Sequence, residues 1–302
     1  MIKTIRPSVT IGIPAHNEGK NIKALLLTIL NQVQRDFEIK NIIVISDASS
    51  DTTVSQVKSL KNQKIQIFEN PNRSGKSACI NQIFAKSRAD IVVIFDADIK
   101  LPDQKVLQTL LTPMITDSEV KLVSGYVKPI SPQTFAQHIA YMSWHVWDLT
   151  KKIANQPMYF CEGAIRAFAK PLYKQLVFPS FSADDVYPYL YCQTHSLKYY
   201  YKPEAYAQFV LPATLRDYFK QNIRYLHSQN VQEKNFDKDL ISKSYTITMS
   251  HKLRGLWQSM TQSPGWTLIY IGVVPLVHLV AFFDKKEVSA NWTVISSTKD
   301  TL

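Results

Sequence analysis

The feature of the sequence that most constrains the fold is a short apolar run that ends in paired carboxylates. Residues 91–95 read Ile-Val-Val-Ile-Phe, and Asp96-Ala97-Asp98 follows directly. A continuous β-branched run of this length is typical of a strand buried on both faces of a parallel sheet. Such sheets bind ligands at their carboxyl edge, where two carboxylates suit Mg²⁺ or Mn²⁺ carrying a diphosphate. Capping of the following segment by Asp96 and Asp98 is the alternative.

The first half of the chain alternates between strand-like and helix-like segments. Strands are expected at residues 9–13, 42–45, 65–68, 91–95 and 121–127. The clearest helix lies between the first two strands, where apolar residues from 22 to 33 recur at helical spacing. Weaker helices are expected near 53–60, 77–87 and 103–111. This βαβα order predicts an α/β fold with a mostly parallel sheet and helices on both faces.

The second half is richer in aromatic residues and ends in an apolar stretch. Residues 134–153 predict a helix, for which core packing is favoured over membrane contact. Residues 265–283 are almost wholly apolar and meet the lower length limit of a membrane span, roughly 17–25 residues. Pro275 and His278 leave a kinked or re-entrant segment open, and a buried core helix is the alternative. We expect residues 241–257 on the membrane surface, and a division into 1–235 and a membrane-associated region 236–302.

The composition limits the classes of partner. The 302 residues contain 35 Lys and Arg against 24 Asp and Glu, a formal net charge of +11. A basic surface attracts nucleic acid, phosphorylated small molecules or acidic lipids, and nucleic acid is disfavoured because none of its binding motifs is found. Cys79, Cys161 and Cys192 lack zinc or disulfide spacing and fit a reducing compartment. Residues 1–7 lack the apolar core of a signal peptide.

Polar residues follow each of the first four expected strands. Pro14 is expected to turn the chain out of the first strand. Asp47, at the tip of the second strand, could accept an N–H of a nucleotide base. After the third strand, Arg73 and Lys76 add positive charge and Gly75 permits a close backbone approach, although Walker A spacing is absent. Polar residues at four strand ends favour one shared ligand site over four separate helix caps.

The order of these motifs resembles glycosyltransferase family 2, which has the GT-A fold. The resemblance covers roughly residues 9–225. In the first half it is carried by Pro14-Ala15-His16-Asn17-Glu18, Asp47, Asn72-Arg73-Ser74-Gly75-Lys76 and Asp96-Ala97-Asp98. In the second half it is carried by Tyr159-Phe160-Cys161-Glu162-Gly163, Ala183-Asp184-Asp185 and Gln221-Asn222-Ile223-Arg224-Tyr225. The last motif is similar to the Gln-x-x-Arg-Trp motif of membrane-bound members such as cellulose, chitin and hyaluronan synthases.

The resemblance implies a role for each matching residue. Asp185 would be the general base, and Arg224 would neutralise the departing diphosphate. Asp96 and Asp98 would hold Mg²⁺ or Mn²⁺. The donor nucleotide-sugar would contact Pro14, Ala15, Glu18, Asp47, Arg73, Lys76, Asp96 and Asp98. The acceptor would contact Cys161, Glu162, Gly163, Asp184, Gln221 and Tyr225. Three residues depart from the family pattern: Asp184 replaces Glu, Glu162 replaces Gly, and Tyr225 replaces Trp, which weakens the expectation of processive synthesis.

We therefore expect a membrane-associated, metal-dependent, inverting glycosyltransferase whose catalytic domain faces the cytoplasm. It would move a sugar from a UDP-sugar to a glycan or lipid-linked acceptor, in polysaccharide or cell-envelope glycan synthesis. A single apolar segment could not form an export channel, so export of a long polymer would require a partner membrane subunit. The alternatives are a polyprenyl-phosphate sugar synthase, a catalytically silent membrane scaffold, and a basic protein that only binds anionic lipid.

Overall fold

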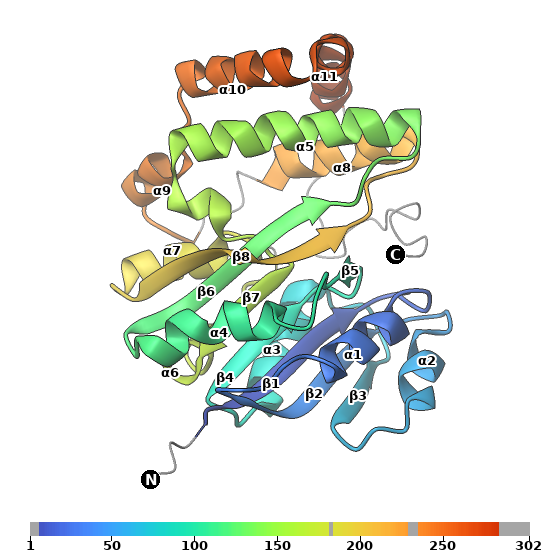
Figure 1. Ribbon diagram of the computed structural model, residues 1–302, viewed down its shortest axis with the longest axis vertical. Helices are drawn as coiled ribbons and strands as arrows, with labels where there is room; N and C mark the ends of the chain where they lie inside the picture. The colour runs from blue at the N-terminus through green and yellow to red at the C-terminus, as the bar shows by residue number, and fades with distance from the viewer. Residues whose placement is uncertain (1–5, 181–183, 229–234, 284–302) are drawn as a thin grey trace.

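The computed structural model describes residues 6–180, 184–228 and 235–283, and for residues 224–228, 278 and 281–283 it describes the backbone only. Figure 1 shows a sheet layered between helices, with a further group of helices beyond one end of it. The strands are β1 (Ser8–Ala15), β2 (Glu38–Asp47), β3 (Ile65–Asn70), β4 (Ile91–Phe95), β5 (Ile99–Lys100), β6 (Val120–Pro129), β7 (Ile165–Ala169) and β8 (Lys198–Phe209). The helices are α1 (Ile22–Leu30), α2 (Thr53–Ser59), α3 (Lys76–Lys86), α4 (Val106–Thr116), α5 (Phe135–Ala154), the 3-10 helix η1 (Pro157–Phe160), α6 (Lys170–Tyr173), α7 (Tyr187–Thr194), α8 (Leu215–Ser228), α9 (Lys238–Tyr245), α10 (Met249–Gln262) and α11 (Pro264–Phe283).

The sheet has the strand order β3-β2-β1-β4-β7-β6-β8-β5. Strands β1 to β4 pair in parallel, and β6 also pairs in parallel with β8. The remaining pairs, β4–β7, β6–β7 and β5–β8, are antiparallel. Because β1 to β4 run the same way, their carboxyl ends meet at one edge of the sheet. This edge carries the predicted ligand residues.

Apolar side chains fill both faces of the sheet. All five residues of β4 are buried, as expected for a central strand. On one face the strands pack against α1, α2 and α4, and α1 contributes Ile22, Leu25, Leu26 and Ile29 from its helical stripe. On the other face they pack against α3, η1, α6 and α7. Each fully buried side chain of this size contributes about 1.5–3 kcal/mol, so the apolar periodicity of α1 is sufficient to fix it on the sheet.

The expected α/β fold with helices on both faces is confirmed, but the sheet is more mixed than the first half of the sequence suggests. β7 enters antiparallel between β4 and β6, so the strand at 120–129 does not lie beside β4. The sequence pattern did not reveal β7 and β8. β7 carries Arg166 in its interior, and β8 mixes tyrosines with charged residues, so neither has a clean apolar signature.

Pro14 does not end the first strand. The pairing of β1 with β2 continues through Pro14 to Ala15, whereas its pairing with β4 ends at Gly12. Proline lacks the N–H that a ladder needs on both sides of a central strand. The expectation that Pro14 turns the chain out was therefore wrong: the strand runs two residues past its expected end at Ile13, and polar residues follow from His16 onward.

The C-terminal helices pack against the rest of the chain. α9 contacts η1, α10 runs along α5, and α11 contacts α5, α8 and α10. The helix expected at 265–283 is present as α11, and Val273 and Val277 pack it into a cluster with α5 and α8. No helix among the described residues is long and apolar enough to cross a membrane, which corrects the expected membrane-spanning segment. Part of 241–257 is also packed inside, since Ile241 is buried. The division at residue 235 remains a prediction.

Candidate active site

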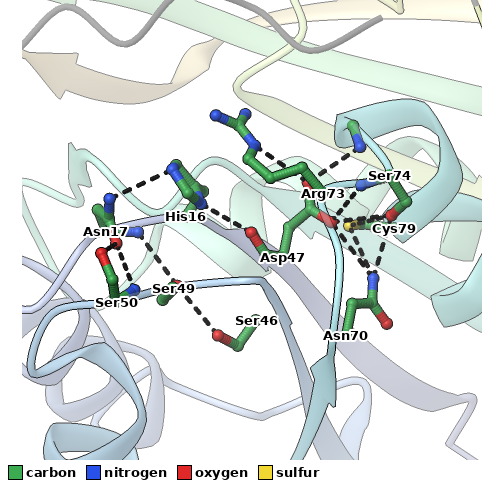
Figure 2. A network of polar contacts seen from close by, with 11 residues as sticks. His16, Asn17, Ser46, Asp47, Ser49, Ser50, Asn70, Arg73, Ser74 and Cys79 are labelled. Carbon is green, nitrogen blue, oxygen red and sulfur yellow. Dashed lines mark hydrogen bonds and ion pairs between the residues drawn. The ribbon is translucent and has the colours of Figure 1, made fainter.

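The loops after β2 and β3 are joined by the Asp47 carboxylate (Figure 2). Its Oδ1 accepts hydrogen bonds from the backbone N–H and the hydroxyl of Ser74, both at 2.8 Å, and its Oδ2 accepts the N–H of Gly75 at 2.9 Å. The Nε of Arg73 lies 3.7 Å from Oδ2. Burial alone would favour protonation, but these hydrogen bonds hold the pKa of Asp47 below its ordinary value. Asp47 is thus an ionised carboxylate that shapes the loop leading into α3.

Gly75 is the residue that lets this loop close. Its φ of 86° lies in the left-handed region, where a side chain would be strained, and it stands at the N-terminus of α3. The loop conformation points the N–H groups of Ser74 and Gly75 at Asp47. The next residue, Lys76, is then the first residue of the helix and points toward β4.

The tips of β1 and β2 are locked together by side chains. The ring of His16 contacts the carbonyl of Asp47 at 2.7 Å, and the Asn17 carbonyl oxygen Oδ1 accepts the N–H of Ser50 at 2.9 Å (Figure 2). Asn17 and Ala48 both have a φ of 54°, which is unusual for residues other than glycine. Strained backbone of this kind is often found at ligand sites. The same tip positions the predicted donor residues Ala15 and Glu18.

Glu18 lies in the turn that leads into α1 and is not at the open surface. It is buried, and its carboxylate accepts a hydrogen bond from the side-chain amide of Asn21 at 3.2 Å. Its N–H donates to the hydroxyl of Thr53 in α2 at 2.7 Å. These contacts tie α1 to α2. The predicted contact of Glu18 with the nucleoside therefore stays a prediction.

Lys76 connects the donor side of the site to the turn that carries the predicted base. Its Nζ lies 2.7 Å from Oδ1 of Asp96 and 3.0 Å from Oδ2 of Asp184. Arg166, a fully buried residue of β7, reaches the same Oδ2 atom of Asp184 at 3.0 Å and also donates to the Asp184 carbonyl. Residues from α3, the segment after β4, β7 and the turn before α7 therefore meet in one charged cluster.

The pKa values in this cluster follow from burial and from the sign of the neighbouring charges. Burial lowers the pKa of Lys76, but Asp184 and Asp96 outweigh it and raise that pKa. Burial raises the pKa of Asp184, yet Lys76 and Arg166 bring it below its ordinary value. Burial, with Asp98 and Asp184 nearby, raises the pKa of Asp96 despite Lys76. Lys76 and Asp184 thus form a charged pair, whereas burial and the neighbouring carboxylates favour the neutral form of Asp96.

Asp185 follows Asp184 directly and lies against Gly163. A Cβ atom added to Gly163 would lie 1.9 Å from Oδ1 of Asp185, so a glycine is required for this approach. Burial and the adjacent charge of Asp184 raise the pKa of Asp185 to about 6. A carboxylate with such a pKa is mostly ionised at neutral pH and remains a competent proton acceptor. The geometry brings the predicted base and the predicted acceptor loop into contact.

The carboxylates beside β4 fit a divalent cation in charge. Asp98 is partly exposed next to Asp96. Four carboxylates (Asp96, Asp98, Asp184 and Asp185) face two cations (Lys76 and Arg166). Among the residues that the structure describes, no group of three or more His, Cys, Asp or Glu is arranged to hold a metal ion. A cation here would therefore rely on Asp96 and Asp98 together with ligand or water oxygens, as Mg²⁺ commonly does.

The predicted acceptor loop begins in η1 and ends beside Asp185. Cys161 is buried in the core cluster that includes α3 and α7, so its side chain supports the loop from behind. Burial raises the pKa of its thiol to about 12. Glu162 forms an ion pair with Lys151, a buried residue of α5 that also lies 3.5 Å from Asp148. The unusual glutamate of this loop thus has a dedicated partner.

The Gln-x-x-Arg-Tyr segment lies in α8, which contacts α5 and α11. Gln221 is partly buried in this helix. The side chains of Arg224 and Tyr225 lie outside what the structure describes. Their predicted roles on the diphosphate and the acceptor stay predictions.

Sequence reasoning missed three residues that organise the site. Ser74 was quoted only as part of a motif, Arg166 was not singled out, and Lys151 was not connected to Glu162. Arg166 does leave a signal, because it is the lone charge in the apolar segment Ile165–Ala169. Lys151 leaves a weaker signal, because a lysine in the last turn of a helix is common. Its burial depends on tertiary packing, which the sequence pattern does not show.

The mostly parallel sheet with helices on both faces is a fold of the GT-A class. The structure resembles the mannosyltransferase PcManGT from Pyrobaculum calidifontis in complex with GDP-Man and Mn²⁺, with a TM-score of 0.66, 18% identity, and coverage of 94% of this chain and 89% of that one. It also resembles glucosyl-3-phosphoglycerate synthase from Mycobacterium tuberculosis with Mn²⁺, UDP and phosphoglyceric acid, with a TM-score of 0.53, 15% identity, and coverage of 77% and 80%.

The sequence model of Glycosyl transferase family 2 matches residues 10–177, and the chain belongs to this family. A probable glycosyltransferase of Bacillus subtilis, YdaM, is 32% identical over 130 residues, covering 41% of this chain and 30% of that protein. The dolichol-phosphate mannosyltransferase of Pyrococcus furiosus is 28% identical over 122 residues, covering 40% and 34%. The chain thus matches about a third of the length of these curated relatives. The expected family and fold are confirmed, while the cellulose and chitin synthase branch is not.

Proposed function

We propose that this protein is a membrane-associated, inverting glycosyltransferase that uses a UDP-sugar, a divalent cation and an acceptor hydroxyl. The observation that carries the proposal is the convergence of Asp96, Asp184 and Asp185 around Lys76 at the edge where β1 to β4 end. The proposed acceptor is a glycan or a lipid-linked molecule, and the catalytic domain is proposed to face the cytoplasm.

The donor nucleotide is proposed to lie across the tips of β1 to β3. Asp47 and Arg73 line this end, and the ionised Asp47 fixes the Ser74–Gly75 backbone. An acidic residue with a lowered pKa can accept an N–H from a uracil ring. The solved complexes of a structural neighbour hold UDP with Mn²⁺, but another holds GDP-Man. Comparing UDP- with GDP-sugars therefore tests the base of the donor directly.

The leaving diphosphate is proposed to lie beside Asp98 and Asp96. A divalent cation bound there would stabilise the negative charge that develops on the departing diphosphate. Lys76 holds Asp96 in place through its 2.7 Å ion pair. Arg224 is proposed to add positive charge from α8. These residues together leave the sugar facing the Asp184–Asp185 turn.

Asp185 is proposed to remove the proton of the attacking hydroxyl. Its elevated pKa of about 6 matches the needs of a base near neutral pH, a contribution of typically 10²–10⁴-fold in rate. Asp184 keeps the turn in position through its pairs with Lys76 and Arg166. A base on the side of the sugar opposite the diphosphate produces a single displacement, and this inverts the anomeric centre.

The acceptor is proposed to approach past η1 and α9. Tyr159, Trp147 and Tyr245 form a chain of edge-to-face rings there, with centroids 5.0 Å and 6.1 Å apart. The Tyr159 hydroxyl also donates to the carbonyl of Tyr245 at 2.9 Å. Partly exposed aromatic rings next to a polar loop suit the apolar face of a sugar or the chain of a lipid. Burial, with smaller contributions from Tyr159 and the Asp185 charge, raises the pKa of Tyr245.

A polyprenyl-phosphate sugar synthase is the second candidate, because three of the curated relatives carry dolichol-linked names: two dolichol-phosphate mannosyltransferases and a dolichyl-phosphate glucosyltransferase. These matches cover only 35–40% of this chain. In this candidate the attacking oxygen belongs to a lipid phosphate, which needs no general base. The importance of Asp185 therefore separates the two functions.

The test is a panel of UDP- and GDP-sugars given to the purified full chain with Mn²⁺, with Mg²⁺, or with EDTA. Acceptors would be a membrane lipid extract, a polyprenyl phosphate and short oligosaccharides. We expect metal-dependent release of UDP, and a β-linked product from an α-linked donor by NMR. Release of the nucleotide only from GDP-sugars would overturn the UDP assignment, and retention of the anomeric configuration would overturn the inverting mechanism.

A further inference from the structure

α10 presents an apolar stripe to the outside of the protein. Met249, Leu253 and Trp257 recur every four residues, so they share one helix face, and 66%, 58% and 71% of their surface is exposed. The opposite face is seated on α5. A Cβ atom on Gly255 would lie 2.3 Å from the Thr150 hydroxyl oxygen, so the two helices are in close contact. The stripe is therefore fixed facing outward by the packing of the helix behind it.

α11 extends the same exposed surface. Leu268, Leu276 and Leu279 are 61%, 52% and 56% exposed, while Thr267 and Val277 are buried on the inner side. The Ser259 and Thr267 hydroxyls share a hydrogen bond of 2.9 Å that joins the two helices. Figure 1 shows α10 and α11, coloured orange to red, at the end of the molecule farthest from β1 to β3. We call the outward surface the α10–α11 face, formed by Met249, Leu253, Trp257, Leu268, Leu276 and Leu279.

The charged residues of α10 and α11 have one sign. Lys252 and Arg254 flank the α10 stripe and are exposed, and neither α10 nor α11 contains an aspartate or a glutamate. A second copy of the chain would bring these cations against like charges. A surface with anionic headgroups would instead pair with them, while Leu and Trp side chains enter the boundary between headgroups and acyl chains. An exposed tryptophan in this position is also typical of membrane interfaces.

We propose that the α10–α11 face docks in the plane of an anionic lipid bilayer, and that α10 and α11 lie on the membrane without crossing it. This deepens the membrane association in the proposed function by naming the docking surface and the headgroup charge. The inner side of α11 is committed to α5 and α8 through Val273 and Val277, so only its outer side is available to lipid. In an in-plane orientation the inner side of α11 keeps its contacts with α5 and α8 while its outer side contacts lipid.

The test is flotation of the full chain with extruded vesicles, without nucleotide or metal, so its failure is separate from any failure of sugar transfer. Vesicles of phosphatidylcholine alone are compared with equal parts phosphatidylcholine and phosphatidylglycerol. We expect the unaltered protein to bind the mixed vesicles. The double variant Leu253→Ser/Trp257→Ser should bind them at least tenfold more weakly. The matched control, Leu27→Ser/Val177→Ser, removes two apolar side chains that are 44% and 66% exposed elsewhere, and should bind like the unaltered protein.

The electrostatic part has its own matched pair. Lys252→Gln/Arg254→Gln should weaken binding to the mixed vesicles about tenfold or more, whereas Lys61→Gln/Lys64→Gln, which removes two exposed lysines near β3, should change it less than twofold. Raising the salt from 50 to 500 mM should weaken binding of the unaltered protein. No flotation with either vesicle would overturn the proposal. Equal binding by Leu253→Ser/Trp257→Ser would also do so, and so would a dimer lost in that variant without any vesicle binding.

Discussion

Lys76 and Asp184 form a 3.0 Å ion pair that joins the N-terminus of α3 to the turn carrying the proposed base. Lys76 begins α3, directly after the loop held by Asp47, and Asp184 precedes Asp185. Two halves of the chain separated by more than one hundred residues are thereby fixed to each other. Because Asp184 is 1% exposed, water screens this pair little.

Removing the Lys76 charge should damage both halves of the site. In Lys76→Met, Asp96 and Asp184 lose a shared counter-charge, and we expect turnover to fall at least 10²-fold and the melting temperature to drop. Breaking a buried pair by removing one partner typically costs about 3–5 kcal/mol, discounted here because Lys76 is 24% exposed. Steady-state kinetics and thermal unfolding measure the two effects. The matched change Lys58→Met removes an exposed lysine paired with Glu69 and should leave both within error; an equally mild Lys76→Met would contradict the role given to the pair.

Turnover should depend on pH through Asp185. Burial and Asp184 raise its pKa to about 6, against the opposing charges of Lys76 and Arg166. The base must be ionised to accept a proton, so kcat/KM should fall as the pH drops below 6 and reach a plateau above 7. A cation and diphosphate bound nearby alter the local charge, so kcat should show a different midpoint from kcat/KM. A kcat/KM that is flat between pH 5 and 8 would speak against a carboxylate base with this pKa.

Asp47→Asn should weaken donor binding more than it slows the chemical step. An amide replaces one of the two carboxylate oxygens with an NH2 group, so the N–H of either Ser74 or Gly75 faces another donor and the loop loses part of its closure. We expect the KM for the nucleotide sugar to rise at least tenfold with a smaller change in kcat. Ser74→Ala keeps the backbone N–H bond to Asp47 and removes the 2.8 Å hydroxyl bond to Asp47 and the 3.1 Å bond from Asn70, so it should fall between this variant and the unaltered protein. Calorimetric titration with UDP provides the check, and unchanged affinity in both variants would remove Asp47 from the donor site.

Gly163→Ala should displace the base without unfolding the protein. The new Cβ would lie 1.9 Å from Oδ1 of Asp185, and the carboxylate can rotate away because it ends a flexible side chain. A displacement of about 1 Å at a reacting group can cost 10²-fold in rate. We expect kcat to fall by that order while donor affinity stays within threefold. Gly272→Ala, which meets no heavy atom within 4 Å, is the control that should be fully active.

The elements that depend on local patterns could be predicted, and those that depend on distant partners could not. The buried run of β4 and the periodicity of α1 led directly to a parallel α/β core with its ligand edge. β7 was not predicted, because a buried arginine inside a strand is explained only by its ion pair with Asp184, which is distant in the sequence. The carboxylates of the site were found because motif order placed them, but the ion pairs of Lys76 and Lys151 required the folded chain. The apolar residues of α11 predicted a helix correctly. That one side of this helix packs against α5 and α8 could be seen only in the folded chain.

The most direct measurement compares Asp185→Asn with the unaltered protein for both UDP binding and sugar transfer. We expect the variant to keep Mn²⁺-dependent UDP binding within about threefold, because Asp185 lies on the acceptor side beside Gly163. We expect its transfer to fall by 10²–10⁴-fold, the contribution of a general base. Transfer at the unaltered rate, with binding intact, would contradict the assignment of Asp185 as the base at the centre of this site.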